Sequence, residues 1–164
     1  MFPHEAMREI DETVARYPDP ASALLPLLHI AQREEGWIAP EAEQWIADRL
    51  GIAPARVRGV VTFYTMFATK PMGRHVLQLC RTLSCELRGA PDIKAHLERR
   101  LGLRAGETSA DGAFSLVEVE CLGACGTAPA MMVNDAYHEN LTPERVDEIL
   151  DALQASPPRP GGGR

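Results

Sequence analysis

The four cysteines of this 164-residue chain fall into two tight pairs, with none left over. Four residues separate Cys80 from Cys85, and three separate Cys121 from Cys125. Each pair begins where a hydrophobic run ends, His-Val-Leu-Gln-Leu before the first and Phe-Ser-Leu-Val-Glu-Val-Glu before the second. Such runs are typical of strands. Two loops that follow two strands would therefore supply four thiolates, the ligand set of one tetrahedral metal site or iron–sulfur cluster.

The composition favours a compact cytoplasmic protein. With 45% apolar residues the chain can bury a core without disulfides, and its net charge of −6 argues against nucleic acid or an anionic membrane as a partner. No apolar stretch approaches the roughly 20 residues of a membrane span. The first ten residues lack the basic and apolar regions of a secretion signal. We therefore expect reduced cysteines in the cytoplasm, used for metal or redox chemistry, and no direct membrane insertion.

The residues up to a turn at Lys70–Gly73 have the pattern of helices. Apolar residues recur at helical spacing in three segments, each with a proline at the first helical position. Pro26 falls inside the first segment and predicts a kink or a delayed helix start. The expected helices lie between Pro20 and Gly36, between Pro40 and Leu50, and from Pro54 into the aromatic residues Phe63, Tyr64 and Phe67.

After this turn, strands alternate with helices. The predicted order is strand His75–Cys80, helix Pro91–Leu101, strand Phe114–Glu120, a hairpin of 130–133 and 136–139, and a helix that Thr142 caps and Pro143 opens. This order predicts a small α/β domain with a mixed sheet of about four strands. We expect the division 1–73, 74–155 and a disordered, proline- and glycine-rich tail at 156–164.

The four cysteines fit three interpretations: a zinc site, disulfides or a [2Fe–2S] cluster. Zinc tolerates gaps of three and four residues, although a gap of two is more familiar. Disulfides would close loops too short to constrain the unfolded chain much, and the Cys-x2-Cys of dithiol oxidoreductases is missing. A [2Fe–2S] cluster needs two thiolates for each iron, which two close pairs supply. The small residues of the second loop would let N–H groups approach the sulfurs, Thr82 and Ser84 add hydroxyls, and a larger side chain at Gly123 should crowd this loop. The cluster leads on ligand number alone, with zinc and disulfides still open.

The motifs Cys80-Arg-Thr-Leu-Ser-Cys85 and Val119-Glu-Cys-Leu-Gly-Ala-Cys-Gly-Thr-Ala-Pro129 resemble the thioredoxin-like [2Fe–2S] ferredoxins. More closely, they resemble the small cluster-bearing subunits of the NADH-oxidising module of respiratory complex I. The resemblance extends over roughly residues 15 to 155 and includes four further segments, Gly51–Pro54, Val61–Phe67, Val133–Tyr137 and Leu141–Glu144.

The resemblance implies an N-terminal helical bundle joined to a thioredoxin-like α/β domain, with Cys80, Cys85, Cys121 and Cys125 as ligands of one [2Fe–2S] cluster. It implies an electron-transfer subunit that exchanges single electrons with the FMN of a larger, NADH-binding flavoprotein subunit. That complex would be membrane-attached, with this chain in its peripheral arm. The alternatives are an equivalent subunit of an NAD-dependent hydrogenase or formate dehydrogenase, a stand-alone ferredoxin, and a zinc-stabilised interaction module.

The residues agree with a division of labour between subunits. The chain contains neither Gly-x-Gly-x-x-Gly nor Gly-x-x-x-x-Gly-Lys, the glycine fingerprints of nucleotide binding. We therefore expect no catalytic residue here and hydride chemistry in the partner, which would dock on the helical region. The five histidines lack metal-type spacing, so structural or solvated roles are expected for them.

Overall fold

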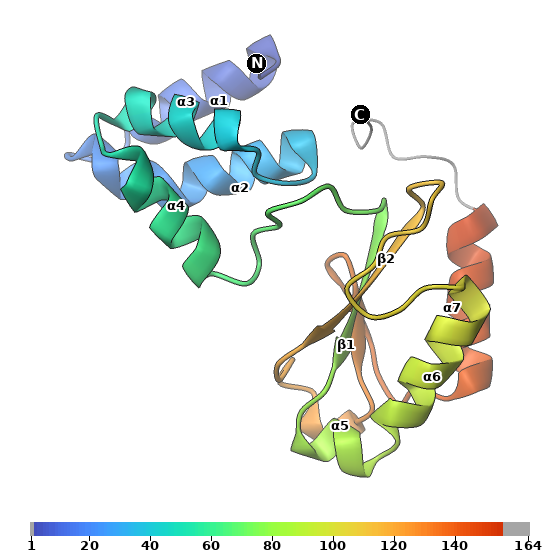
Figure 1. The fold of residues 1–164 in the computed structure, drawn as a ribbon. Helices are drawn as coiled ribbons and strands as arrows, with labels where there is room; N and C mark the ends of the chain where they lie inside the picture. The colour runs from blue at the N-terminus through green and yellow to red at the C-terminus, as the bar shows by residue number, and fades with distance from the viewer. Residues whose placement is uncertain (1, 156–164) are drawn as a thin grey trace. The chain divides into compact units, whose positions relative to one another are not determined.

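The computed structural model describes residues 2–155 and forms two compact units, the first ending at Pro71 and the second beginning at Met72 (Figure 1). The tail expected at 156–164 lies outside the described residues. Within residues 2–155, no helix combines the length and the apolar character needed to cross a membrane.

The first unit is helical, as the spacing of its apolar residues predicts. Asp19 Oδ1 accepts a hydrogen bond from the Ala21 amide at 3.0 Å and starts a short 3₁₀ turn, so the α-helix that follows begins only at Leu24. Pro26 thus lies in the first helical turn, where its missing N–H costs nothing, and the predicted delayed start is confirmed. The elements are α1 (His4–Val14), η1 (Pro20–Ala23), α2 (Leu24–Glu35), α3 (Pro40–Leu50) and α4 (Pro54–Phe63).

Helix α1 is the element of this unit that the patterns above do not single out. Its buried residues Ala6, Ile10 and Val14 recur every four positions and join one core with α2, α3 and α4. Two ion pairs also join α1 to the neighbouring helices. Glu9 pairs with Arg33 of α2 and Asp11 with Arg49 of α3, each with an N–O distance of 2.6 Å. Because both pairs are exposed, the buried stripe supplies most of the attachment energy.

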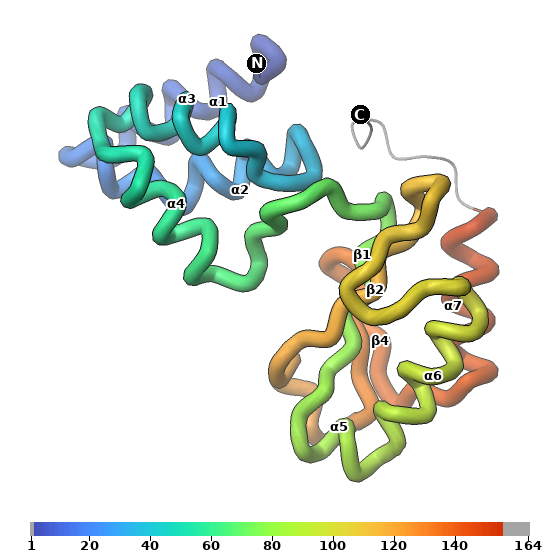
Figure 2. The backbone as a smooth tube through the Cα atoms, in the orientation of Figure 1, coloured from blue at the N-terminus to red at the C-terminus, as the bar shows by residue number. Residues whose placement is uncertain are grey.

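The second unit contains the predicted mixed sheet of four strands, in the order β2-β1-β3-β4, of which β1, β2 and β4 are labelled in Figure 2. Strands β1 and β2 are parallel, whereas β1 with β3 and β3 with β4 are antiparallel. The turn at Asn134 and Asp135 joins β3 to β4, as predicted, with Asn134 at a φ of 53°. The strands are β1 (His75–Cys80), β2 (Phe114–Val119), β3 (Met131–Val133) and β4 (Ala136–His138).

Two helices, α6 (Ala90–Leu101) and α7 (Pro143–Ala155), pack beside each other in this unit (Figure 1). His96 Nε2 lies 2.9 Å from Asp147 Oδ1 and joins the two helices. Thr142 Oγ1 accepts from the Arg145 amide at 3.2 Å, so it is the predicted cap of α7. The helices and the sheet share one apolar core, whose fully buried members include Leu77, Leu97, Leu116, Met131, Val146 and Leu150.

Candidate metal centre

The parallel pairing of β1 and β2 brings the starts of the two cysteine loops together. Cys80 ends β1 and lies opposite Val119, the last residue of β2, and the Arg81 amide donates to the Val119 carbonyl at 3.0 Å. Cys121 follows two residues after Val119. Because parallel strands end at the same edge of a sheet, cysteines 41 positions apart in the sequence become neighbours.

Short helical segments then place the second cysteine of each loop. Cys85 lies in α5 (Leu83–Leu87), and Cys125 opens the 3₁₀ turn η2 (Cys125–Thr127). The sequence predicts loops at both places, and the structure corrects this. The second loop closes at a cis peptide bond between Ala128 and Pro129.

All four predicted cysteines are free thiols that converge on one place. Cys121 and Cys125 have their Sγ atoms 3.5 Å apart, and Cys80 and Cys85 lie close enough to shift each other's pKa. The two pairs also interact electrostatically, Cys80 with Cys121 and Cys125 with Cys85. The first pair is buried and the second is exposed, so the site has a closed side and an open side.

Backbone amides act on three of the sulfurs. The Gly123 amide donates to Cys121 Sγ at 3.3 Å, and the amides of Leu122 and Ala130 favour the charged forms of Cys80 and Cys85, whose pKa values they lower. Amide donors of this kind stabilise negative charge on thiolates or on an anionic cluster that they bind. The amino-acid types do not reveal contacts made by backbone amides. The sequence therefore indicates only that small residues would allow such contacts.

Thr82 supplies the hydroxyl donor that the sequence suggested. Its Oγ1 lies 3.2 Å from Cys80 Sγ and also hydrogen-bonds to Cys121, so it joins the two pairs. Thr82 occupies the N-cap position of α5 but makes no side-chain cap bond there, because its hydroxyl is turned to the sulfurs. Within the described chain, the Ser84 hydroxyl makes no such contact.

The two buried thiols differ in their affinity for a proton. Burial works against ionisation of Cys80, yet hydrogen bonds from Thr82, from the Leu122 amide and from Cys85 leave its pKa below the ordinary value. Burial and the neighbouring Cys80 raise the pKa of Cys85 to about 11. Of the two buried thiols, Cys80 therefore loses its proton more readily than Cys85.

In the exposed pair, the Gly123 amide is the largest cause of a lowered pKa at Cys121. Gly123 has a φ of 80°, which lets its N–H turn back to this sulfur. A Cβ at Gly123 would meet no atom within 4 Å, so an added methyl group alone does not crowd the loop, and the effect of a larger side chain stays a prediction. The left-handed backbone is the reason for glycine here.

The arrangement of the sulfurs fits a two-iron cluster. Among the described residues, no three His, Cys, Asp or Glu side chains are grouped as ligands of one metal ion. The thiols lie instead as two close pairs, and each iron of a [2Fe–2S] cluster takes two thiolates. The amide donors and the open glycine positions also suit an anionic group. Three of the described histidines have other partners: His96 pairs with Asp147, and His29 and His75 contact aromatic rings.

Comparison with known proteins agrees with this geometry. Residues 10–154 match the family "Thioredoxin-like [2Fe-2S] ferredoxin". An E-type subunit of NADH-quinone oxidoreductase from Rhizobium meliloti (strain 1021) is 48% identical, over 90% of this chain and 88% of its own length. "NADH-quinone oxidoreductase subunit 2" of Thermus thermophilus is 44% identical, over 89% and 82%.

Among solved structures, an NAD⁺-reducing [NiFe]-hydrogenase in the H₂-reduced state contains a similar fold, with a TM-score of 0.74 and 23% identity. The match covers 83% of this chain but 23% of the hydrogenase chain, so the same fold forms a minor part of that longer polypeptide. The family match and the identities to the subunits confirm the expected resemblance. This chain belongs to the thioredoxin-like [2Fe–2S] ferredoxin family, whose cofactor is a [2Fe–2S] cluster, and within it to the group of E-type subunits of NADH-quinone oxidoreductase.

Proposed function

We propose that this chain is an electron-transfer subunit of an NADH:quinone oxidoreductase and that Cys80, Cys85, Cys121 and Cys125 hold its [2Fe–2S] cluster. The convergence of four free thiols in two close pairs, in a member of this family, carries the proposal. Cys80 and Cys85 bind one iron, and Cys121 and Cys125 bind the other.

The chain's own residues prepare the site for a group that changes its charge by one electron. The cluster, when bound, supplies reversible one-electron chemistry. Amides of Leu122, Gly123 and Ala130 and the Thr82 hydroxyl offset the negative charge on the thiolates. The buried pair excludes water on one side, and the exposed pair leaves the side from which a redox partner can approach.

The partner in this proposal is a larger flavoprotein subunit that binds FMN and NADH, in the cytoplasmic peripheral arm of a membrane-attached complex. The names of the relatives support it, as does the lack of a nucleotide-binding glycine fingerprint in this sequence. We assign residues 1–73 to docking and residues 74–155 to the cluster. Thus the cluster domain exchanges electrons, and the helical region holds the partner.

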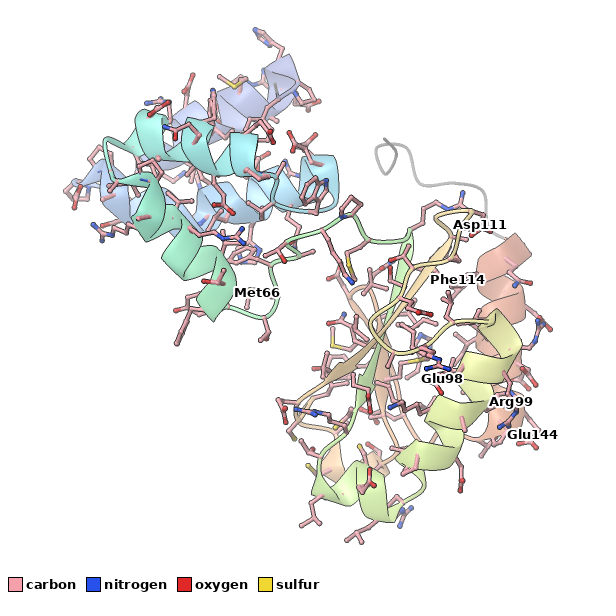
Figure 3. The ribbon with its side chains drawn as sticks, viewed as in Figure 1. Met66, Glu98, Arg99, Asp111, Phe114 and Glu144 are labelled. Atoms are coloured by element: carbon pink, nitrogen blue, oxygen red, sulfur yellow. The ribbon has the colours of Figure 1, made fainter. Side chains whose placement is uncertain are left out.

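The end of α4 supplies the apolar surface for such docking. The aromatic residues at this end differ in burial: Phe67 is buried in the helical core, whereas Phe63 is 75% exposed. Met66, labelled in Figure 3, is also exposed, and Tyr64 lies edge-on to Phe63 with their ring centroids 4.9 Å apart. Exposed apolar side chains gathered in this way are typical of protein contacts.

Co-purification with anaerobic reduction tests the proposal. A tagged chain expressed in its own host should retain a flavin-containing subunit, and NADH should reduce its cluster in that complex but leave the cluster of the isolated chain oxidised. A chain that elutes alone with an intact cluster would instead be a stand-alone ferredoxin. The identity of the remaining subunits separates a quinone-linked complex from a hydrogenase or formate dehydrogenase.

A further inference from the structure

Tyr137 contacts the second cysteine loop from a different part of the sheet. It lies on the edge strand β4 and is 52% exposed, yet its hydroxyl donates to the Leu122 carbonyl at 3.0 Å. Leu122 lies between Cys121 and Cys125, fifteen positions before Tyr137. The contact therefore fastens the middle of the loop to the sheet.

The peptide group that accepts this bond also serves a sulfur. The Leu122 carbonyl and the Gly123 amide belong to the same planar unit, and that amide donates to Cys121 Sγ at 3.3 Å. Tyr137 thus begins a continuous series of hydrogen bonds that passes through one peptide group to Cys121. The preceding amide, that of Leu122, lowers the pKa of Cys80, so this segment of the loop acts on one sulfur of each pair.

Hydrogen bonds in series strengthen one another. A donor on a peptide oxygen draws electron density from the nitrogen, and the N–H on the other side becomes a better donor. A stronger N–H to sulfur bond favours the state with more negative charge on the sulfur, which here is the reduced state. The Tyr137 hydrogen bond also fixes the orientation of this peptide group. Gly123 has a φ of 80° and lacks a side chain that would hold the peptide in that orientation.

We propose that Tyr137 is a positioning residue that raises the reduction potential of the cluster through the peptide of Leu122 and Gly123. The proposal depends on the proposed ligands, since Cys121 and Cys80 must bind iron for their hydrogen bonds to matter. Tyr137 is not itself a ligand, and its influence passes through the backbone alone.

A redox titration of the full chain, followed by the EPR signal of the reduced cluster at pH 7, tests this with Tyr137→Phe. The ring remains and the hydroxyl is lost, so the cluster should assemble but become harder to reduce. We expect the ratio of reduced to oxidised cluster at a fixed potential to fall about two- to fourfold. For a one-electron couple this corresponds to roughly 18 to 36 mV. Tyr17→Phe, at an exposed tyrosine of the helical unit, is the matched control and should leave the potential unchanged.

If Tyr137→Phe fails to assemble a cluster, a second variant tests the same hydrogen bond. Replacing Tyr137 with 3-fluorotyrosine keeps the hydrogen bond and makes its donor stronger, so the potential should rise above that of the wild type. An unchanged potential in Tyr137→Phe with full cluster content would overturn the inference while leaving the proposed function intact. The inference also fails if the fluorinated protein titrates like the wild type. A wild-type chain without iron would remove both the inference and the proposed function.

Discussion

At the scale of single residues, the different pKa shifts of Cys80 and Cys85 bear on metal binding. The pKa of Cys85 is raised to about 11, whereas the pKa of Cys80 is lowered. Thiolates, not thiols, bind metals, so the proton on Cys85 must leave when iron enters. Less free energy is therefore needed to deprotonate Cys80 than Cys85.

Replacing Cys125 with serine tests the ligand set directly. We expect Cys125→Ser to lose most of the cluster, or to retain one with a strongly altered spectrum, because one iron would lack its second thiolate. The measurement is the EPR spectrum of the dithionite-reduced protein. His96→Gln is the control: it removes the contact with Asp147 and should keep the spectrum. An unaltered spectrum in the serine variant would exclude Cys125 as a ligand.

Two glycines of the second loop give a matched pair of alanine variants. Neither position has an atom within 4 Å of an added Cβ, but only Gly123 has a positive φ. Gly123→Ala should cost roughly 1 to 2 kcal/mol of strain and move the amide that serves Cys121. The expected result is a lower midpoint potential or reduced iron content, with little change in Gly126→Ala. Equal effects of the two substitutions would contradict the assigned role of the left-handed backbone.

Much of the site could be predicted at this scale, because side-chain chemistry is visible in a sequence. The four cysteines and Thr82 were predicted, and the structure brings them together. The positive φ of Gly123 was not predicted, because φ depends on how the loop closes. The contact of Tyr137 with the Leu122 carbonyl was not predicted, because any residue type can supply a carbonyl.

At the scale of the elements, the start of β1 depends on a close approach of two backbones. A Cβ at Gly73 would lie 2.5 Å from the carbonyl carbon of Phe114, and the Gly73 amide donates to Ser115 Oγ at 2.7 Å. Because the obstacle is backbone, Gly73→Ala should destabilise the protein by about 1 to 3 kcal/mol. Gly59→Ala, on the exposed side of α4, meets no atom and should stabilise by about 0.5 to 1 kcal/mol. Urea unfolding followed by circular dichroism measures both, and a neutral Gly73→Ala would disprove the close approach.

A histidine on strand β4, His138, makes the free energy of unfolding depend on pH. Burial, helped by the charge of Arg145, lowers the pKa of His138 below its ordinary 6.5. The unfolded chain therefore binds this proton more readily, and the free energy of unfolding falls as the pH drops below about 6.5 through the folded-state pKa. His138→Gln should lose less stability than the wild type between about pH 7 and pH 5. Parallel pH dependences in urea unfolding would show that His138 contributes nothing.

Helices and strands were predicted correctly where a periodic pattern of apolar residues ends at a recognisable turn or capping residue. The strands, the hairpin at Asn134 and Asp135, and the α7 cap at Thr142 follow from local chemistry. Helix α1 was not singled out, although Ala6, Ile10 and Val14 carry its signal, because no strong cap precedes it. Helix α5 is too short for a periodic pattern, and its cap residue binds sulfur instead.

At the scale of the whole molecule, the chain joins a helical unit with its own apolar core to an α/β unit that contains all four thiols. This separation matches the proposed division between docking and electron transfer. The sequence shows a change in pattern at the turn near Lys70, and the first unit of the structure ends at Pro71. The pairing of the two cysteine loops required the parallel register of β1 and β2, which the order of the elements alone does not specify.

The central claim is that the four sulfurs hold two bridged irons. Iron, zinc and acid-labile sulfide are therefore measured on the anaerobically purified wild-type chain, together with its EPR spectrum before and after dithionite. We expect about two irons and two sulfides per chain, with a one-electron signal that appears only on reduction. A colourless protein with about one zinc and no sulfide, or with no metal and paired cysteines, would contradict the account.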